Sequence, residues 1–170
     1  MLDKKIEQAL NEQINAELAA SYKYLAMGAY FEDLNLTGFA SWMLKQHEEE
    51  RTHAMKLFHY IHARNGCVVL EAVEKPERNF KTPKEAFIRA LDLEKENTSS
   101  IYSLYTLATQ IGDYATQSHL KWFLDEQVEE ERLLEEARAL MEIAGDDRSA
   151  LLLLNEKFGG RVSAPGEKKL

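Results

Sequence analysis

The sequence predicts an all-α fold: a four-helix bundle in up-down-down-up order, with one long crossover and a short fifth helix at the C-terminus. Apolar residues recur every three or four positions over four long stretches, which is typical of helices that pack around a common core. The three prolines, Pro76, Pro83 and Pro165, interrupt none of these stretches. One connection is long and the others are short, as in a bundle with a single crossover.

Capping residues and glycines predict where the helices begin and end. Five helices are expected, over residues 3–33, 37–65, 83–111, 113–144 and 147–158. The candidate N-caps of the second to fifth helices are Thr37, Thr82, Asp113 and either Asp146 or Asp147. Pro83 follows its cap at the first helical position, where proline loses no hydrogen bond. Gly66, Gly145 and Gly159-Gly160 are the expected stops of the second, fourth and fifth helices.

The connections between the helices predict their order in space. The first and second helices are joined by a few residues, as are the third and fourth, so each pair is expected to form an antiparallel hairpin. Residues 66–82 are long enough to return along the whole bundle, and the apolar run at 68–70 predicts that this segment packs along the outside. Residues 1–160 are expected to form one domain, followed by a disordered tail over 161–170.

The composition excludes several functional classes. The chain of 170 residues has a formal net charge of −8, which argues against a general nucleic-acid binder and suits a protein that handles cations. Its single cysteine, Cys67, rules out an internal disulfide framework and fits a reducing compartment. No stretch resembles a signal peptide or a bilayer-spanning helix. A cytoplasmic protein without nucleic-acid or membrane partners is therefore expected.

Each of the four long apolar stripes contains a glutamate near its middle. These residues are Glu17, Glu50, Glu94 and Glu130. Each lies within about three residues of the midpoint of its expected helix, so the four side chains are expected at one level of the bundle, pointing inward. An ionised carboxylate in a core costs several kcal/mol unless something neutralises it. The pattern therefore predicts cations bound between the helices.

The second helix adds a histidine to this set. Glu50 and His53 are three residues apart and share a helix face, so they can bind one ion or two neighbouring ions. Oxygen-rich ligation with a single imidazole favours iron or manganese over structural zinc. Four carboxylates balance two divalent cations, so two ions are expected, with Glu50 as the bridge. Glu17 then completes one position, and Glu94 and Glu130 hold the other.

Three further glutamates lie beside these inner-face positions. Glu49, Glu126 and Glu129 belong to acidic runs that are usually solvated helix faces, but they lie close enough to the main site to hold a third ion. The remaining histidines have no matching partners and are expected at the surface or in packing: His47, His59, His62 and His119. Trp42 and Trp122 are expected to pack, with Trp122 near the metal site.

Two polar residues share the inner face with the expected ligands. Tyr24 lies two turns beyond Glu17 and, taken alone, is interpreted as core filler with a hydrogen-bonded hydroxyl. Gln127 lies one turn before Glu130. Its position fits plain burial and fits a hydrogen bond to a metal ligand or an oxygen species equally well.

The chain resembles the ferritin family, specifically the non-haem ferritins of bacteria and archaea. The resemblance extends to about residue 160. It rests on Glu17 with Tyr24, on Glu50-x-x-His53, on Glu94 and on the segment Leu-Asp-Glu-Gln-Val-Glu-Glu at 124–130. The segments at 30–33 and 39–42 are also similar to this family.

The resemblance implies a ferroxidase that oxidises Fe(II) with dioxygen or peroxide and stores the product as a ferric oxyhydroxide mineral. It assigns the first iron to Glu17, Glu50 and His53, and the second to Glu50, Glu94 and Glu130, with Gln127 nearby. It assigns a third iron site to Glu49, Glu126, Glu129 and Glu130, and makes Tyr24 an electron donor. The family forms hollow homo-oligomeric shells of 24 subunits, with the short fifth helix at the fourfold contacts.

Differences from related families indicate which branch of the ferritins this chain resembles. Bacterioferritins have a second Glu-x-x-His where this chain has Gln127 and Glu130, and a haem-binding methionine where it has Arg51, so no haem is expected. Mini-ferritins lack the fifth helix, and rubrerythrins need paired cysteines. Gln117 and Leu120 stand where animal ferritins have the acidic residues of their threefold pores, so that route for iron is not expected here.

Two functions other than iron storage also fit the sequence. One is a soluble di-iron enzyme that consumes dioxygen or peroxide, or oxidises an organic substrate, without storing mineral. The other is an acidic, partner-binding bundle without metal. The fifth helix, with its apolar run at 151–154, favours storage because a shell needs contacts that a free enzyme does not.

Overall fold

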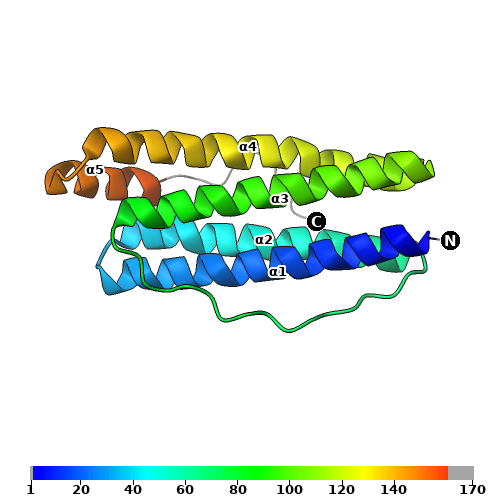
Figure 1. Ribbon diagram of the computed structural model, residues 1–170. Coiled ribbons are helices and arrows are strands. Elements are labelled where there is room, and N and C mark those ends of the chain that lie inside the picture. The colour runs from blue at the N-terminus through cyan, green and yellow to red at the C-terminus, as the bar shows by residue number, and fades with distance from the viewer. Residues whose placement is uncertain (1, 161–170) are drawn as a thin grey trace.

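The computed structural model describes residues 2–160, and within them the chain forms five α-helices and no β-strand (Figure 1). The helices are α1 Lys4–Asp33, α2 Thr37–Ala63, α3 Pro83–Ile111, α4 Tyr114–Ala144 and α5 Arg148–Gly159. Each limit lies within two residues of the expected one. The disordered tail expected over 161–170 lies outside the described residues. Within the part of the chain that is described, no helix has both the length and the apolarity needed to cross a membrane.

The four long helices form the bundle that the connections predict. α1 packs along α2, and α3 packs along α4, each as an antiparallel pair. The segment after α2 runs back along the whole molecule before α3 begins, so α2 and α3 are parallel (Figure 1). The order is therefore up-down-down-up, and α5 lies against the beginning of α2, at the end of the bundle opposite the N-terminus.

Most of the expected capping residues take that role. The side chains of Thr82, Asp113 and Asp147 each accept a hydrogen bond from a backbone N–H in the first turn of α3, α4 and α5. Gly145, with φ 54°, follows the last residue of α4, as expected. α2 ends at Ala63, two residues early, because the chain turns at Asn65 with φ 56° before it reaches the expected glycine stop.

The assignment of Thr37 as the N-cap of α2 is wrong, and the helix is capped by another helix instead. Leu36 occupies the cap position and offers no side-chain hydrogen bond. Oδ1 of Asn155, in α5, accepts the N–H of Phe39 at 3.0 Å and so satisfies a free donor of the first turn. The two backbones are so close that a Cβ on Gly38 would lie 1.8 Å from the carbonyl oxygen of Asn155. Only glycine fits there.

Two asparagines of α1 hold the first part of the crossover against the bundle. Nδ2 of Asn11 donates to the carbonyl of Cys67 at 2.9 Å, and its Oδ1 accepts the N–H of Val69 at 2.7 Å. Asn15, one turn later, repeats the pattern: it donates to the carbonyl of Val69 at 2.9 Å and accepts the N–H of Glu71 at 2.8 Å. These side chains replace the backbone partners that an extended segment otherwise lacks.

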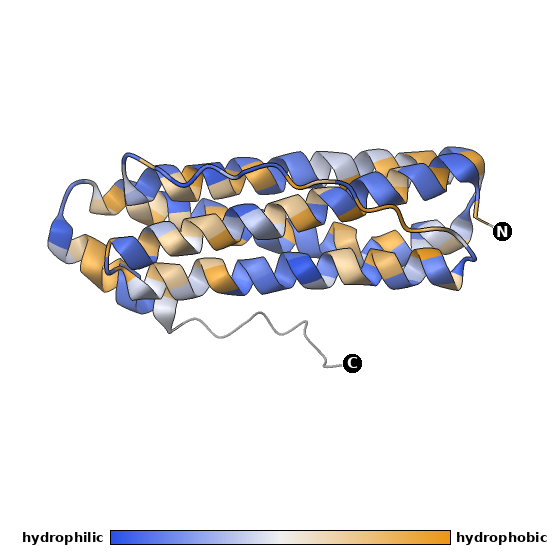
Figure 2. Cartoon of the chain, turned by 90° about the horizontal axis from the view of Figure 1, so that it is seen from below, coloured by the Kyte–Doolittle hydropathy of each residue, from blue (hydrophilic) through white to orange (hydrophobic). Residues whose placement is uncertain are grey.

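The apolar run at 68–70 was expected to hold the crossover by packing, and only its first residue does so. Val68 is partly buried against the core, whereas Val69 and Leu70 remain 54% and 60% exposed. In Figure 2 this first part of the crossover is orange, and the part that follows is blue. The crossover is therefore attached mainly through backbone hydrogen bonds.

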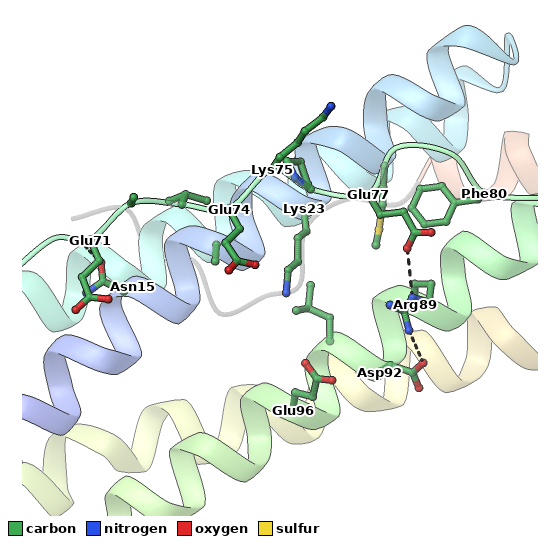
Figure 3. Close-up of a pocket in the computed structure, with 16 residues that line it drawn as sticks. Asn15, Lys23, Glu71, Glu74, Lys75, Glu77, Phe80, Arg89, Asp92 and Glu96 are labelled. Carbon is green, nitrogen blue, oxygen red and sulfur yellow. Dashed lines mark hydrogen bonds and ion pairs between the residues drawn. The ribbon is translucent and has the colours of Figure 1, made fainter.

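A hollow of about 370 Å³ lies between the second part of the crossover, α1 and α3 (Figure 3). Lys23 extends into it, and Arg89 at its edge lies 3.6 Å from Glu77 of the crossover and 3.9 Å from Asp92. None of the carboxylates expected to bind metal lines this hollow. The charged side chains around this hollow are of both signs and largely exposed, so the hollow is not a candidate metal or catalytic site.

The apolar core of the described residues is divided into two clusters. One cluster occupies the end that carries α5, and it includes Phe31, Phe39, Phe87 and Phe158. The other occupies the end near the N-terminus, and it includes Ile6, Leu57, Leu104 and Phe123. On every long helix, the expected ligand lies between the residues of these two clusters. A polar layer therefore separates them at mid-bundle.

Candidate metal centre

Four glutamates, one from each long helix, come together in this polar layer. Glu17, Glu50 and Glu94 are 0% exposed, and Glu130 is 3% exposed. Their charges interact with one another, because Glu17, Glu94 and Glu130 all raise the pKa of Glu50. The bundle thus buries four carboxylates at one level, as the apolar stripes predict.

His53 completes one side of this group. One ligating atom each from Glu17, Glu50 and His53 can be chosen so that all three lie within 4.8 Å of one another. Nδ1 of His53 lies 3.5 Å from Oε2 of Glu50 and 3.9 Å from Oε2 of Glu17. Two carboxylates and one imidazole at these separations surround a space suited to a single divalent cation.

Glu50 is the least satisfied carboxylate in the site. Both of its oxygens are buried and receive no hydrogen bond from the described residues. Burial first, and then the charges of Glu94 and Glu17, raise the pKa of Glu50 well above its ordinary value. A buried carboxylate without donors is strongly destabilising unless it is protonated or bound to a cation. This residue is where the donor set fits a metal ion most clearly.

Glu94 is held by two polar neighbours. The hydroxyl of Tyr24 donates to Oε1 of Glu94 at 2.5 Å, and Nε2 of Gln127 donates to Oε2 at 3.2 Å. Burial raises the pKa of Glu94 to about 7, although these two hydrogen bonds act in the opposite direction. Burial and the charge of Glu94 raise the pKa of Tyr24 well above its ordinary value, so its phenol is protonated at neutral pH. The structure thus places both polar residues against an expected ligand.

Glu130 lies among the three additional glutamates. Burial, then Glu94, and then Glu49, Glu126 and Glu129, raise the pKa of Glu130 well above its ordinary value. Gln46 donates to Oε2 of Glu130 at 3.3 Å and also to Glu49. Unlike the buried four, these three glutamates are only half-buried. Partly exposed negative charge therefore lies close to Glu130.

Two buried amides beside Glu17 were not predicted from the sequence. Nε2 of Gln13 donates to Oε1 of Glu17 at 2.8 Å, and Nδ2 of Asn97 donates to Oε2 at 3.2 Å. The sequence does contain a signal for such residues, because a glutamine lies one helical turn before three of the four buried glutamates. These glutamines are Gln13, Gln46 and Gln127.

The other histidines and tryptophans lie in packing contacts or at the surface, as expected, and His59 and His62 are exposed. The rings of Trp122 and His53 meet edge to face, with centroids 5.3 Å apart, so Trp122 does border the site. The ring of His119 stacks on Tyr60 at 4.0 Å. None of His47, His59, His62 and His119 joins the metal-ligand group found among the described residues. Trp42 packs in the apolar cluster near α5.

Comparisons with known proteins agree with this architecture. The sequence model of the ferritin-like domain matches residues 7–144. Bacterial non-heme ferritin of Staphylococcus aureus (strain USA300) is 41% identical over 162 residues, which cover 95% of this chain and 98% of that protein. The same protein of Staphylococcus saprophyticus is 39% identical over 161 residues, 95% of this chain and 96% of the relative. The open pore ferritin of the archaeon Archaeoglobus fulgidus superposes with a TM-score of 0.94 at 39% identity, covering 95% of this chain and 100% of that one.

Proposed function

We propose that this chain, which belongs to the ferritin family and is an iron-storage ferroxidase, oxidises Fe(II) at an intrasubunit di-iron centre in the polar layer. The proposal rests above all on Glu50, whose two buried oxygens lack hydrogen-bond donors. Iron is the substrate of this site, and the ligands are the five residues Glu17, Glu50, His53, Glu94 and Glu130.

The ligands divide into two overlapping sets. The first Fe(II) is bound by Glu17, Glu50 and His53. The short distances between the ligating atoms of these three residues support this assignment. The second is bound by Glu50, Glu94 and Glu130, with Gln127 hydrogen-bonded to one of its ligands. Glu50 belongs to both sets and bridges them. Four carboxylates then balance the charge of two divalent ions, so neither the site nor the metal pair is left with a large buried charge.

The chemistry at this site is an electron transfer between bound ions and an oxidant. Each Fe(II) gives up one electron, and two electrons together with two protons from water reduce dioxygen to hydrogen peroxide, or hydrogen peroxide to two water molecules. The products are Fe(III) ions, which hydrolyse and are stored as a ferric oxyhydroxide mineral. The protein contributes the positions of the two ions and a donor set of hard oxygen ligands, which favours the ferric state.

A third iron position lies among Glu49, Glu126, Glu129 and Glu130. All three half-buried residues raise the pKa of Glu130, so their negative charges act on the same small region. Glu129→Ala is expected to lower the number of Fe(II) ions bound per subunit, with a smaller effect on the initial oxidation rate, because the buried ligands stay in place. Anaerobic Fe(II) titration and stopped-flow oxidation measure the two quantities.

Glu136→Ala provides the matched control for this variant. Glu129 and Glu136 each lie 3.8 Å from the same arginine, Arg132, and Glu136 is two turns further along α4. The control variant should bind as much Fe(II) as the wild type. Unchanged stoichiometry in Glu129→Ala would remove the case for a third position.

Tyr24 is an electron donor to the centre in this proposal. Its hydroxyl hydrogen-bonds to Glu94 at 2.5 Å, so Glu94 can take the phenolic proton when the ring loses an electron to the oxidant. Tyr24→Phe is expected to retain rapid Fe(II) oxidation but to lose the tyrosyl radical signal seen by freeze-quench electron paramagnetic resonance. Tyr30→Phe, six residues further along α1, should keep that signal. A radical of wild-type intensity in Tyr24→Phe would exclude this role.

The assembly is proposed to be a homo-oligomeric shell of 24 subunits in the cytoplasm, without haem. Residues 1–160 form its single domain. α5 supports this assembly, because Leu152 and Leu153 are 56% and 67% exposed and need a neighbouring surface. Size-exclusion chromatography before and after iron loading tests the proposal. A particle of one or two subunits would instead favour a free di-iron enzyme that stores no mineral.

A further inference from the structure

Glu17 differs from Glu50 in the hydrogen bonds that its carboxylate receives. Both residues are 0% exposed. Yet Glu17 receives hydrogen bonds on both oxygens, from Gln13 at 2.8 Å and from Asn97 at 3.2 Å, whereas Glu50 receives none from the described residues. Gln13 and Asn97 are themselves almost fully buried, at 1% and 8% exposure. Two buried side chains are therefore committed to this single carboxylate.

The orientation of both amides is set by a chain of hydrogen bonds that begins at the surface. Ser100 is an exposed residue, and its hydroxyl donates to Oε1 of Gln13 at 2.6 Å. The NH₂ group of Gln13 must therefore point the other way, toward Glu17. The same NH₂ group donates to Oδ1 of Asn97 at 2.5 Å. The NH₂ group of Asn97 is then directed at the second oxygen of Glu17. Each donor and acceptor has one consistent assignment.

The chemical nature of these donors matters as much as their position. An amide stabilises a carboxylate by hydrogen bonding but carries no charge of its own. A lysine or arginine at the same place would neutralise Glu17 and compete with a cation. Two amides instead keep Glu17 in one rotamer and add no positive charge that would compete with a cation.

We propose that Gln13 and Asn97 are positioning residues that hold Glu17 in its ligating orientation, and that Ser100 orients Gln13 from the surface. They increase the affinity of the first metal position by preorganising its ligand, without contacting the ion. This inference rests on the proposed role of Glu17 as a ligand. Partners that orient metal ligands typically change affinity by about 10–100-fold when they are lost.

The chain offers a closely matched pair of variants for the test. Gln13→Met keeps the length of the side chain and removes its donor. Gln8→Met is the control, because exposed Gln8 also lies on α1 and also donates to a glutamate four residues later, Glu12, at 2.8 Å. Both variants are assembled as full shells and titrated with Co(II) under nitrogen, with Co(II) absorption as the readout.

Gln13→Met is expected to weaken Co(II) binding at the first position by about 10–100-fold and to reduce the intensity of its visible absorption. Gln8→Met should match the wild type. In Fe(II) oxidation, Gln13→Met should raise KM more than it lowers kcat, because the loss is one of binding. A residue with only a structural role would not change the ligand-field spectrum.

If Gln13→Met impairs folding, variants of Ser100 test the proposal instead. Ser100→Ala removes only the hydroxyl of this exposed residue and should weaken Co(II) binding in the same direction, whereas Ser100→Thr, which keeps a hydroxyl, should restore it. Wild-type Co(II) affinity in folded Gln13→Met and in Ser100→Ala would overturn the inference. Glu17→Ala separates the two proposals: if it binds Co(II) as the wild type does, the proposed ligand set itself is wrong.

Discussion

Glu50→Ala is expected to abolish rapid Fe(II) oxidation while leaving the shell assembled. Glu50 is the one ligand shared by both proposed iron positions, so its loss weakens the two at once. Loss of residues that merely orient a ligand already costs about 10–100-fold, and loss of the bridging ligand should exceed that range. Stopped-flow absorbance after mixing with Fe(II) in air measures the rate. Size-exclusion chromatography confirms assembly.

The control for this variant lies two residues away on the same helix. Glu48 is exposed and paired with Arg51 at 2.8 Å, so Glu48→Ala removes a carboxylate from α2 without touching the polar layer. It should oxidise Fe(II) at the wild-type rate. Wild-type oxidation by an assembled Glu50→Ala shell would contradict the proposed bridge.

The second large effect concerns the stability of the metal-free protein. The pKa of Glu94 is raised from 4.5 to about 7, and the pKa values of Glu50 and Glu130 are also raised. Between the unfolded and folded pKa values, the folded protein holds more protons than the unfolded chain. The stability associated with these groups is therefore complete below about pH 4.5 and is lost as the pH rises through 7 and above. The Tm of metal-free protein should fall over this interval.

Removing one titrating carboxylate should reduce that pH dependence. In Glu50→Met the buried, donor-free carboxylate is replaced by an apolar side chain of similar length, so the variant should be more stable than metal-free wild type at neutral pH. The difference in Tm should shrink toward pH 4.5, where Glu50 is protonated. Calorimetry at several pH values measures it, with Glu48→Met as the exposed control. An equal difference at every pH would show that ionisation of Glu50 has no energetic cost.

A bound divalent ion should reverse this trend. Co(II) replaces the protons on the buried carboxylates, so it stabilises the wild type more at pH 7.5 than at pH 5.5. The same ion should have little effect on Glu50→Met. The buried carboxylates thus make the empty bundle less stable and the loaded bundle more stable.

The helices and the buried carboxylates could be predicted from sequence because both depend on periodicity. A glutamate in the middle of an apolar stripe, as at Glu17 or Glu94, is conspicuous because its burial is costly. The helix midpoints then place such residues at one level. Glu50 and His53 share a face for the same geometric reason. These features need only the spacing of residues along one helix.

Features that depend on contacts between helices could not be predicted in this way. Gln13 is connected to Asn97 only through the fold, 84 residues apart in the chain. The capping of α2 by Asn155 joins segments that are 116 residues apart. A threonine beside a helix start is a good local candidate for a cap, but the close approach of α5 at Gly38 provides a different acceptor. Such pairings follow from how helices pack, which a stripe does not specify.

Crystals soaked anaerobically in Fe(II) would test the central proposal most directly. Anomalous scattering at the iron edge should reveal two iron positions in each subunit, one beside Glu17 and His53 and one beside Glu94 and Glu130, with Glu50 between them. Iron bound only at the surface, with the four buried carboxylates contacting no metal, would contradict it.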